Sequence, residues 1–332
     1  MSQRSPDTST FAPATSTQKG GTSACAVCTM FEGDYQFGLA ALVNSLHLHG
    51  FRGTVWVGYR GPLPPWASPL AGNGSGSCYK VAEGLELHFL PLATKNHLTN
   101  YKPDFMLNLW EQHCPEAHAM FYFDPDIVIR CRWSYFEDWA RAGIALCEDI
   151  NSPLSRTHPL RFQWNEIYSR NGYPLKFTAD QYVNGGFQGI TSENRAFLKD
   201  WLQVQEIMGR EIGGLNKITK DVGGREHAFS KTDQDALNIA LAITRQPISV
   251  IGKEGMEFIS GGFTMSHSTG HLKPWNTSFL KESLRGYPPS SASKSHFDHV
   301  EAPIRPYSQM ELKKKRLELR IASAIGRFYC RG

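Results

Sequence analysis

The stretch Ala119-Met-Phe-Tyr-Phe-Asp-Pro-Asp-Ile-Val-Ile129 decides the fold that we expect for this chain. Its first five residues have the length and aromatic content of a buried β-strand. Pro125 has no N–H to donate to a neighbouring strand, so it marks the end of that strand. Asp124 and Asp126 are therefore predicted to lie where a central strand leaves its sheet. Ligands of open α/β sheets bind at this edge.

Two carboxylates at such an edge suit a hard divalent cation, Mn²⁺ or Mg²⁺. The bare Asp-x-Asp pattern is a weak signal, because about one is expected by chance in a chain of this length. The chain contains another in Asp233-Gln234-Asp235. A solvated turn is therefore an alternative interpretation of Asp124 and Asp126. Motifs further along the chain are needed to choose between a metal site and a solvated turn.

The composition is typical of a globular protein, with 41% hydrophobic and 20% charged residues among 332. The length allows one large α/β domain or two smaller ones. A net charge of +4 is too small to indicate nucleic acid, so no such partner is expected. The seven cysteines are scattered, and buried thiols in a reducing compartment explain them best.

No apolar stretch approaches the roughly 20 residues that cross a bilayer, and the N-terminus lacks the apolar segment of a signal peptide. We therefore expect a cytoplasmic protein. Residues 1–23 are rich in Ser, Thr, Gln and Pro and are expected to be disordered.

Expected strands and helices alternate along the chain, which predicts an α/β fold with a mostly parallel central sheet and helices on both faces. The expected strands are 24–30, 54–59, 85–92, 119–123, 144–147, 182–190 and 248–251. The expected helices are 38–49, 102–113, 133–141, 192–208, with Ser192 as its cap, and 233–243. Residues 151–180 are expected to be irregular, and they are rich in aromatic and basic side chains.

A second candidate motif is Met265-Ser-His-Ser-Thr-Gly-His-Leu-Lys-Pro-Trp275. Neutral His267 can bind a metal, Gly270 lets a backbone N–H come close to an anion, and Lys273 suits a phosphate. A surface loop with an incidental histidine is the alternative. The Lys-Pro-Trp ending makes the pattern more specific than a lone histidine.

Two further segments contain candidate residues. In 232–238, Thr232 and Asp235 are close to a capping box, which explains Asp235 but leaves Asp233 and Gln234 without a structural role. In Asn184-Gly-Gly186, the glycines would weaken a strand unless something approaches the backbone closely. A β-bulge is the alternative there.

Taken in order, these motifs resemble those of retaining glycosyltransferases of the GT-A fold, specifically glycosyltransferase family 8, over about residues 24–279. The resemblance implies that Asp124, Asp126 and His267 bind Mn²⁺ or Mg²⁺. It also implies that Gly270 and Lys273 contact the diphosphate of a nucleotide-sugar donor.

The same resemblance assigns roles to the other two segments. Asp233 would bind the donor sugar, and Gln234 would lie near the reacting carbon. Asn184 and Gly186 match the family's Asn-x-Gly and are assigned to donor binding.

The chain departs from the family pattern at two places. The family opens with Thr-Asp-x-x-Tyr at the nucleotide base, whereas Thr29-Met-Phe-Glu-Gly-Asp-Tyr35 is two residues longer and has Glu32 in place of the Asp. Thr29 and Tyr35 remain the candidates for that contact. An Arg usually lies on the helix before the Asp pair, and Lys102 is the nearest basic residue here.

The resemblance implies metal-dependent transfer of a sugar from a nucleotide-diphosphate sugar, in the first place a UDP-sugar, to an acceptor hydroxyl with retention. The acceptor class stays open among glycans, lipid-linked sugars and proteins. One alternative is a sugar-1-phosphate nucleotidyltransferase, although residues 29–35 lack the Gly-rich loop that it needs. Another is a non-catalytic nucleotide-sugar or glycan-binding protein.

The expected organisation is a glycosyltransferase domain at 24–287, followed at 288–332 by a linker and a basic amphipathic helix. Trp164 and Tyr168 could stack on an acceptor sugar, or they could pack a surface loop. The apolar stripe of the last helix predicts peripheral contact with the inner face of a membrane, and packing on the domain is the alternative. The stripe consists of Met310, Leu317, Ile321, Ile325 and Phe328.

Overall fold

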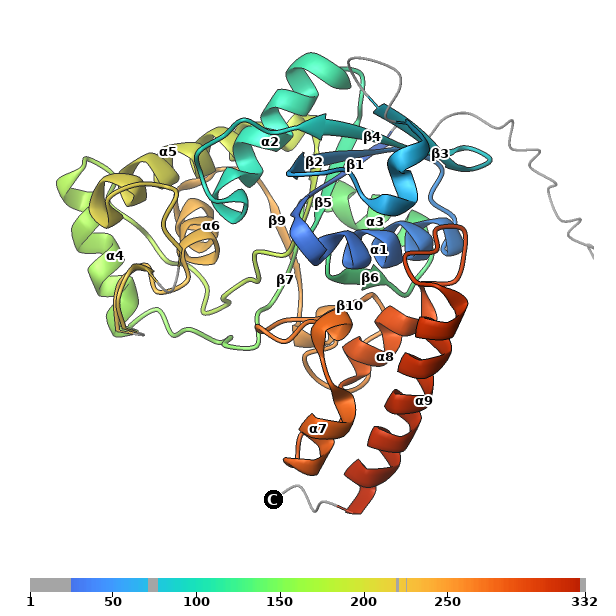
Figure 1. Ribbon diagram of the computed structural model, residues 1–332. Helices are drawn as coiled ribbons and strands as arrows, with labels where there is room; N and C mark the ends of the chain where they lie inside the picture. The colour runs from blue at the N-terminus through green and yellow to red at the C-terminus, as the bar shows by residue number, and fades with distance from the viewer. Residues whose placement is uncertain (1–24, 71–76, 219–220, 225, 329–332) are drawn as a thin grey trace, which may run out of the picture.

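A mixed eight-stranded sheet lies at the centre of the computed structural model, which describes residues 25–70, 77–218, 221–224 and 226–328 (Figure 1). The disorder expected for 1–23 falls outside the described residues. In the sheet the strands follow the order β3-β4-β2-β1-β5-β8-β7-β9. They are β1 Cys25–Glu32, β2 Gly53–Arg60, β3 Ser77–Ala82, β4 Leu85–Pro91, β5 Ala119–Phe123, β7 Ile144–Cys147, β8 Phe187–Thr191 and β9 Ile248–Ile251.

The expected mostly parallel α/β sheet is confirmed. β4, β2, β1 and β5 run parallel to one another, and β7 and β9 form another parallel pair. β8 is antiparallel to both of its neighbours, and β3 is antiparallel to β4. The helices are α1 Gln36–Leu48, α2 Lys102–Asn108, α3 Trp133–Arg141, α4 Pro159–Arg170, α5 Ala196–Ile212, α6 Thr232–Ile243, α7 Phe279–Leu284, α8 Ser291–Asp298 and α9 Gln309–Ile325.

Alternating side chains of the central strands fill two cores, one on each face of the sheet. On β1, Ala26, Cys28 and Met30 belong to the core covered by α2, α5 and α6. Val27 and Phe31 belong to the opposite core, which α1 and α3 cover. β5 is buried along its whole length, as its aromatic composition predicts for a central strand.

The chain reverses its direction of travel across the sheet at β1. It proceeds outward from β1 to β2 and β4, and β5 then pairs with the other side of β1. The carboxyl ends of β1 and β5 therefore flank the point where the strand order reverses. Ligands of open α/β sheets bind outside the strand ends at such a point.

Several expected elements differ from the structure. Residues 151–180 are not wholly irregular, because Pro159 opens α4 and the His158 side chain caps it by accepting from the Leu160 N–H. Ser192 does not cap a long helix; it begins a 3₁₀ turn, and α5 starts at Ala196. β3 has no counterpart among the expected strands. The helix expected at 102–113 is confirmed, its last turn, Leu109–His113, being a π-helix.

The stacking role considered for Trp164 and Tyr168 is wrong. Both are fully buried on the inner face of α4, and their polar atoms are used within the protein. The Trp164 indole donates to the carbonyl of Ala228, and the Tyr168 hydroxyl donates to the carbonyl of Val204 at 2.8 Å. They stabilise the packing of α4 on the domain and present no face to an acceptor.

Cys28, Cys114 and Cys147 are buried, as expected, whereas Cys78 is exposed, which corrects the expectation for that thiol. The last three helices form an extension below the sheet in Figure 1, where α7 and α8 pack against α9. Its apolar core joins Phe279, Phe297, Leu312 and Leu319 to Ala41 of α1. Within the described ranges, no helix combines the length and the apolar character needed to cross a membrane.

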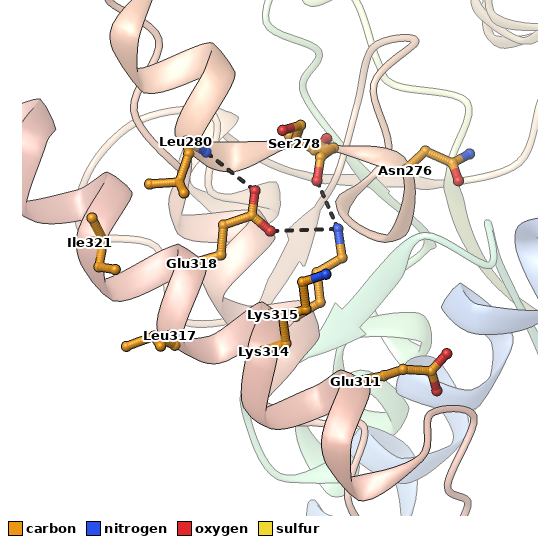
Figure 2. A pocket seen from close by; sticks show the side chains of 10 residues that line it. Asn276, Ser278, Leu280, Glu311, Lys314, Lys315, Leu317, Glu318 and Ile321 are labelled. Atoms are coloured by element: carbon orange, nitrogen blue, oxygen red, sulfur yellow. Dashed lines mark hydrogen bonds and ion pairs between the residues drawn. The ribbon is translucent and has the colours of Figure 1, made fainter.

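A hollow of about 580 Å³ lies between α9 and the segment that leads into α7 (Figure 2). Lys315 closes one side by donating to the carbonyl of Thr277 at 2.9 Å, and Glu318 accepts from the Leu280 N–H at 3.3 Å. The hollow contains no group of three metal-ligating side chains, among the described residues. The candidate chemistry lies instead in a smaller cavity at the sheet edge.

Candidate functional site

A cavity of about 340 Å³ opens at the carboxyl ends of β1 and β5. This volume lies within the range of small-molecule sites. Its walls are the end of β1, the turn after β5, the segment that leads into α2 and the loop after β10, Met265–His267. Its lining residues include Glu32, Tyr35, His97, Thr99, Tyr122, Asp124, Asp126, His267, Gly270 and Lys273.

Asp124, Asp126 and His267 meet at one point of this cavity. One ligand atom from each lies within 4.8 Å of the other two. A separate two-stranded ribbon makes the meeting possible, since β6, Ile127–Ile129, pairs antiparallel with β10, Met265–His267. His267 lies opposite Ile127 in this ribbon, so its imidazole reaches Asp126 with an Nε2–Oδ1 distance of 3.3 Å.

The donor set fits a divalent cation. Carboxylate oxygens with one imidazole nitrogen suit Mn²⁺ and Mg²⁺ better than softer metals. The Nδ1 atom of His267 is buried without a hydrogen-bond partner within the described residues. Asp124, Asp126 and Asp233 carry three negative charges, and Lys102 and Lys273, which contact them, carry two positive charges. One net negative charge remains for a cation to compensate.

Lys273 lies beside the same carboxylate. Its ammonium contacts Asp126 Oδ2 at 2.5 Å and the carbonyl of Ser268 at 2.8 Å. Burial by itself would raise the pKa of Asp126, but His267 and Lys273 outweigh it and hold that pKa well below its ordinary value. The carboxylate is therefore ionised at neutral pH and available to a metal.

Gly270 lies in the loop between His267 and Lys273 and lines the cavity. Its φ of +92° is in the left-handed region, which residues with a side chain rarely adopt. The loop can therefore turn at this residue and present backbone next to Lys273. An amide with an ammonium group nearby is a suitable arrangement for phosphate oxygens.

Lys102 connects the two aspartate motifs. Its side chain is fully buried, and Nζ contacts the Gly185 carbonyl at 2.6 Å, Asp124 at 3.0 Å and Asp233 at 3.2 Å. Burial lowers the pKa of Lys102, but the two carboxylates raise it further, and the net shift is upward. Lys102 is thus a permanent counter-ion that fixes Asp124 and Asp233 relative to each other.

The Asn-Gly-Gly segment lies just before β8 and not inside a strand, which corrects the sequence-based expectation. Site side chains hold it: Asn184 donates to Asp149 at 2.8 Å and to Gln234 at 3.2 Å. A Cβ atom at Gly186 would lie 2.6 Å from Cε1 of His267 and 3.1 Å from Asp124 Oδ2. Gly186 is therefore required by the close approach of Asp124 and His267, and a β-bulge is not its explanation.

Gln234 lies at the N-terminal end of α6 and its Oε1 also accepts from the Gly185 N–H at 3.2 Å. The capping box expected at Thr232 does not form. Asp235 instead accepts from the Lys231 N–H at 2.7 Å and from the Tyr182 hydroxyl at 2.6 Å. Burial raises the pKa of Asp235 to about 7, although these two donors oppose the rise.

The two residues proposed for the nucleotide base occupy different environments. Tyr35 lines the cavity and packs edge-on against Trp275, with ring centroids 5.4 Å apart. Thr29 is fully buried inside β1, and its hydroxyl has no hydrogen-bond partner within the described residues. Glu32, which replaces the family's aspartate, reaches the cavity wall and pairs with Arg60 at 3.1 Å.

Sequence reasoning missed Tyr122 and Asp149. Tyr122 donates to Asp124 at 3.0 Å, and the two-residue period of a strand could have found it, because the two residues share a face. Asp149 follows β7 much as Asp124 follows β5, so the rule that located Asp124 could have located it as well. No sequence signal places His97 and Thr99 at the cavity, because the short 3₁₀ turn before α2, Leu98–Tyr101, brings them there.

Comparisons with known proteins support the fold. No family model matches the chain, and no curated protein sequence does. Among solved structures, the chain is similar to the apo form of the bifunctional glycosyltransferase WbbM, with a TM-score of 0.53 and 14% sequence identity. The match covers 90% of this chain and 52% of the other, so the chain spans about half the length of that protein. The expected GT-A-like α/β fold is thereby confirmed: the chain has a glycosyltransferase fold.

Proposed function

We propose that this protein is a metal-dependent glycosyltransferase that moves a sugar from a nucleotide-diphosphate sugar, in the first place a UDP-sugar, to an acceptor hydroxyl. The observation that supports it most strongly is the meeting of Asp124, Asp126 and His267 beside Lys273. The meeting point lies where α/β sheets bind ligands, in a chain with a glycosyltransferase fold. The motif order that resembles glycosyltransferase family 8 supports retention of anomeric configuration.

We assign the residues of the site to two groups, one that would contact the departing diphosphate and one that would contact the sugar. A divalent cation held by Asp124, Asp126 and His267 would stabilise the negative charge that develops on the departing diphosphate. Lys273 adds a fixed positive charge at the same place, and the turn at Gly270 brings backbone close to the phosphates. These groups favour breaking the bond between the anomeric carbon and the phosphate oxygen.

The sugar itself would contact a second set of residues, Asp233 and Gln234. Asp233, held by Lys102, would accept hydrogen bonds from sugar hydroxyls. The Nε2 group of Gln234 has no hydrogen-bond partner among the described groups and would be free to donate one. An amide is a poor nucleophile. A front-face reaction, in which the acceptor attacks the side that the diphosphate leaves, accounts for retention without a covalent intermediate on Gln234.

A panel of nucleotide-sugar donors, assayed by release of free nucleoside diphosphate with Mn²⁺, tests the proposal. Asp126→Asn and His267→Ala should abolish release and remain folded, and excess EDTA should abolish it in the unmodified protein. Asp138→Asn is the matched control, because Asp138 is exposed on α3 and is not among the residues that line the cavity. Full activity in EDTA would contradict the proposal, and donor binding without release would indicate a non-catalytic binder.

The acceptor is proposed to be a glycan, a lipid-linked sugar or a protein. A sugar-1-phosphate nucleotidyltransferase is not favoured, because the cavity wall at the end of β1 contains Glu32 and Tyr35 in place of a glycine-rich phosphate loop. The same donor panel separates the two, since a nucleotidyltransferase would exchange pyrophosphate and not release nucleoside diphosphate.

A further inference from the structure

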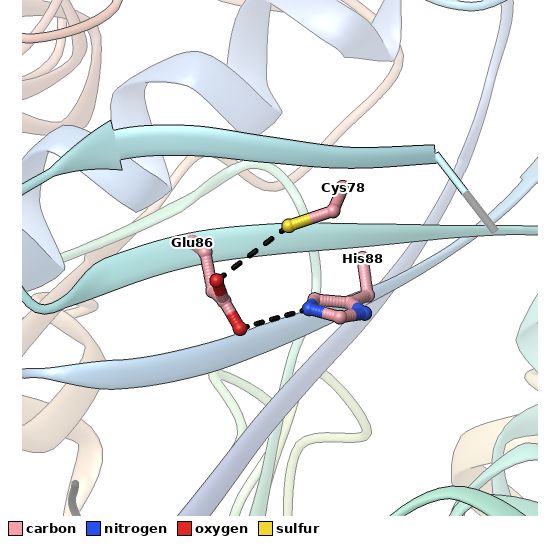
Figure 3. Close-up of side chains that lie close together, drawn as sticks. All are labelled: Cys78, Glu86 and His88. Atoms are coloured by element: carbon pink, nitrogen blue, oxygen red, sulfur yellow. Dashed lines mark hydrogen bonds and ion pairs between the residues drawn. The ribbon is translucent and has the colours of Figure 1, made fainter. Parts of the chain in front are cut away.

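A second group of metal-ligating side chains lies on the outer strands of the sheet, at Cys78, Glu86 and His88 (Figure 3). In the antiparallel pair of β3 and β4, Cys78 lies directly opposite His88. Glu86 is two residues before His88 on β4, so the three side chains share one face. The intervening residue Leu87 points into the core on the other face.

The ligand atoms are already close enough to share one ion. Cys78 Sγ lies 3.5 Å from one carboxylate oxygen of Glu86, and His88 Nε2 lies 2.9 Å from the other. Tetrahedral zinc, with its usual bonds to sulfur, nitrogen and oxygen, holds neighbouring ligand atoms about 3.5 Å apart. Small side-chain rotations would therefore complete the geometry, and Cys78 is exposed, so an ion can enter.

Two residues of the neighbouring strand β2 contact these ligands, since Thr54 pairs with Glu86 and Trp56 with His88 in the sheet. The Thr54 hydroxyl donates to Glu86 Oε1 at 3.3 Å, and the Trp56 ring packs on the imidazole of His88 with centroids 4.7 Å apart. Partners of this kind fix the orientation of metal ligands and strengthen binding. The same contacts would be expected around a zinc site with an ordered outer shell.

We propose that Cys78, Glu86 and His88 form a zinc site separate from the cavity at Asp124. Zn²⁺ would bind the Cys78 thiolate, a Glu86 oxygen and His88 Nε2, with water in the fourth position, and the thiol proton would pass to solvent. The combination of sulfur, nitrogen and oxygen favours zinc over the harder cations expected at Asp124. The ion would join β3, an edge strand, to β4.

Cobalt titration of the metal-free full-length chain tests this site directly. Co²⁺ bound to a thiolate gives a charge-transfer absorption that the Asp124 site, which has no sulfur, cannot give. We expect one such cobalt per chain, with the absorption bleached by added Zn²⁺. Cys78→Ser should remove the absorption, whereas Cys131→Ser, which changes another thiol outside the cluster, should retain it.

Two milder variants keep the test informative. Glu86→Gln and His88→Asn should each weaken zinc binding by more than about tenfold, because each removes a direct ligand. Absence of the charge-transfer band, its persistence in Cys78→Ser, or its equal loss in Cys131→Ser would overturn the proposal. None of these results depends on glycosyl transfer, so failure here and failure of the proposed function are distinguishable.

Discussion

At the scale of single residues, the site depends on charges that compensate one another inside the protein. Asp124 and Asp233 come from segments more than a hundred residues apart, and they meet because Lys102 contacts both. Removing one partner of a buried ionic group leaves the others uncompensated, which costs more than the pair contributes.

Lys102→Met should therefore destabilise the protein by about 3 kcal/mol, at the lower end of the range for breaking a buried ionic group. We expect the lower end because the side chains of Asp124 and Asp233 each remain 22% exposed. Urea unfolding measures the stability, and calorimetry with a nucleoside diphosphate and Mn²⁺ should show weaker binding. Lys199→Met, at an exposed position of α5, is the control and should change neither. An unchanged unfolding midpoint for Lys102→Met would contradict this account of the site.

The raised pKa of Asp235 predicts that the stability of the protein depends on pH. Its pKa is raised to about 7 in the folded protein, above the ordinary value of 3.8, so the folded state holds a proton that the unfolded state releases. The contribution of Asp235 to stability is therefore largest below pH 4 and declines as the pH rises towards about 7.

Asp235→Asn cannot titrate, so the difference in unfolding free energy between the unmodified protein and this variant should fall as the pH rises from about 4 to about 7, by at most about 1.4 kcal/mol per pH unit. Urea unfolding over this pH range measures it. A difference that stays constant with pH would show that Asp235 has an ordinary pKa.

At the scale of elements, α9 presents two apolar faces, and only one is covered. Leu312, Leu319 and Ala322 are buried against α7, α8 and α1. Ser308 and Glu311 form a capping box that fixes where the helix begins. Leu317 stays 58% exposed although it lies on the same helix.

This difference gives a matched pair of variants. Leu319→Ala should destabilise the protein by about 2 kcal/mol, because it removes buried methyl groups and leaves a cavity. Leu317→Ala should change stability by less than about 0.5 kcal/mol, since a surface substitution loses little buried area. Thermal unfolding of both variants checks the packing of α9, and equal effects would contradict it.

At the scale of the whole molecule, the C-terminal extension offers a candidate membrane-contact face. Four residues of the predicted stripe are exposed, namely Met310, Leu317, Ile321 and Phe328. Lys315 donates to the Thr277 carbonyl before α7, and Arg316 donates to the Phe297 carbonyl of α8. The side chains that face solvent are Lys313, Lys314, Arg320 and Arg327. The helix therefore packs on the domain and still exposes most of its stripe, so the two interpretations of this segment are compatible.

We expect the full chain to sediment with anionic vesicles and not with neutral ones, and salt should weaken the binding, because each basic residue contributes about 1 kcal/mol near an anionic surface. The double variant Leu317→Ser and Ile321→Ser should reduce sedimentation without unfolding α9. Truncation before α9 is a poorer test, since it would expose the apolar core shared with α7 and α8. Equal sedimentation with both kinds of vesicle would exclude electrostatic membrane contact.

The sequence by itself determined the elements whose pattern is local. The period of apolar residues located α1 closely, and Pro125 located the end of β5. The bounds expected for α3 and α6 also agree with the structure to within one residue. It also determined the residue types of the site, because Asp-x-Asp after a buried strand and His-x-x-Gly-x-x-Lys are contiguous motifs. Asp124, Asp126, His267 and Lys273 could therefore be named before their positions were known.

Only the tertiary structure decided what depends on residues distant in sequence. The antiparallel pairing of β6 with β10 brings His267 to Asp126 across 141 positions, and no local pattern encodes that register. Trp164 and Tyr168 were candidates for the surface, but the structure buries both in the core. Their segment is basic and aromatic, and this composition is compatible with either location. The role of Lys102 also depends on the tertiary structure. A buried lysine needs carboxylates as counter-ions, and the fold brings Asp124 and Asp233 to it.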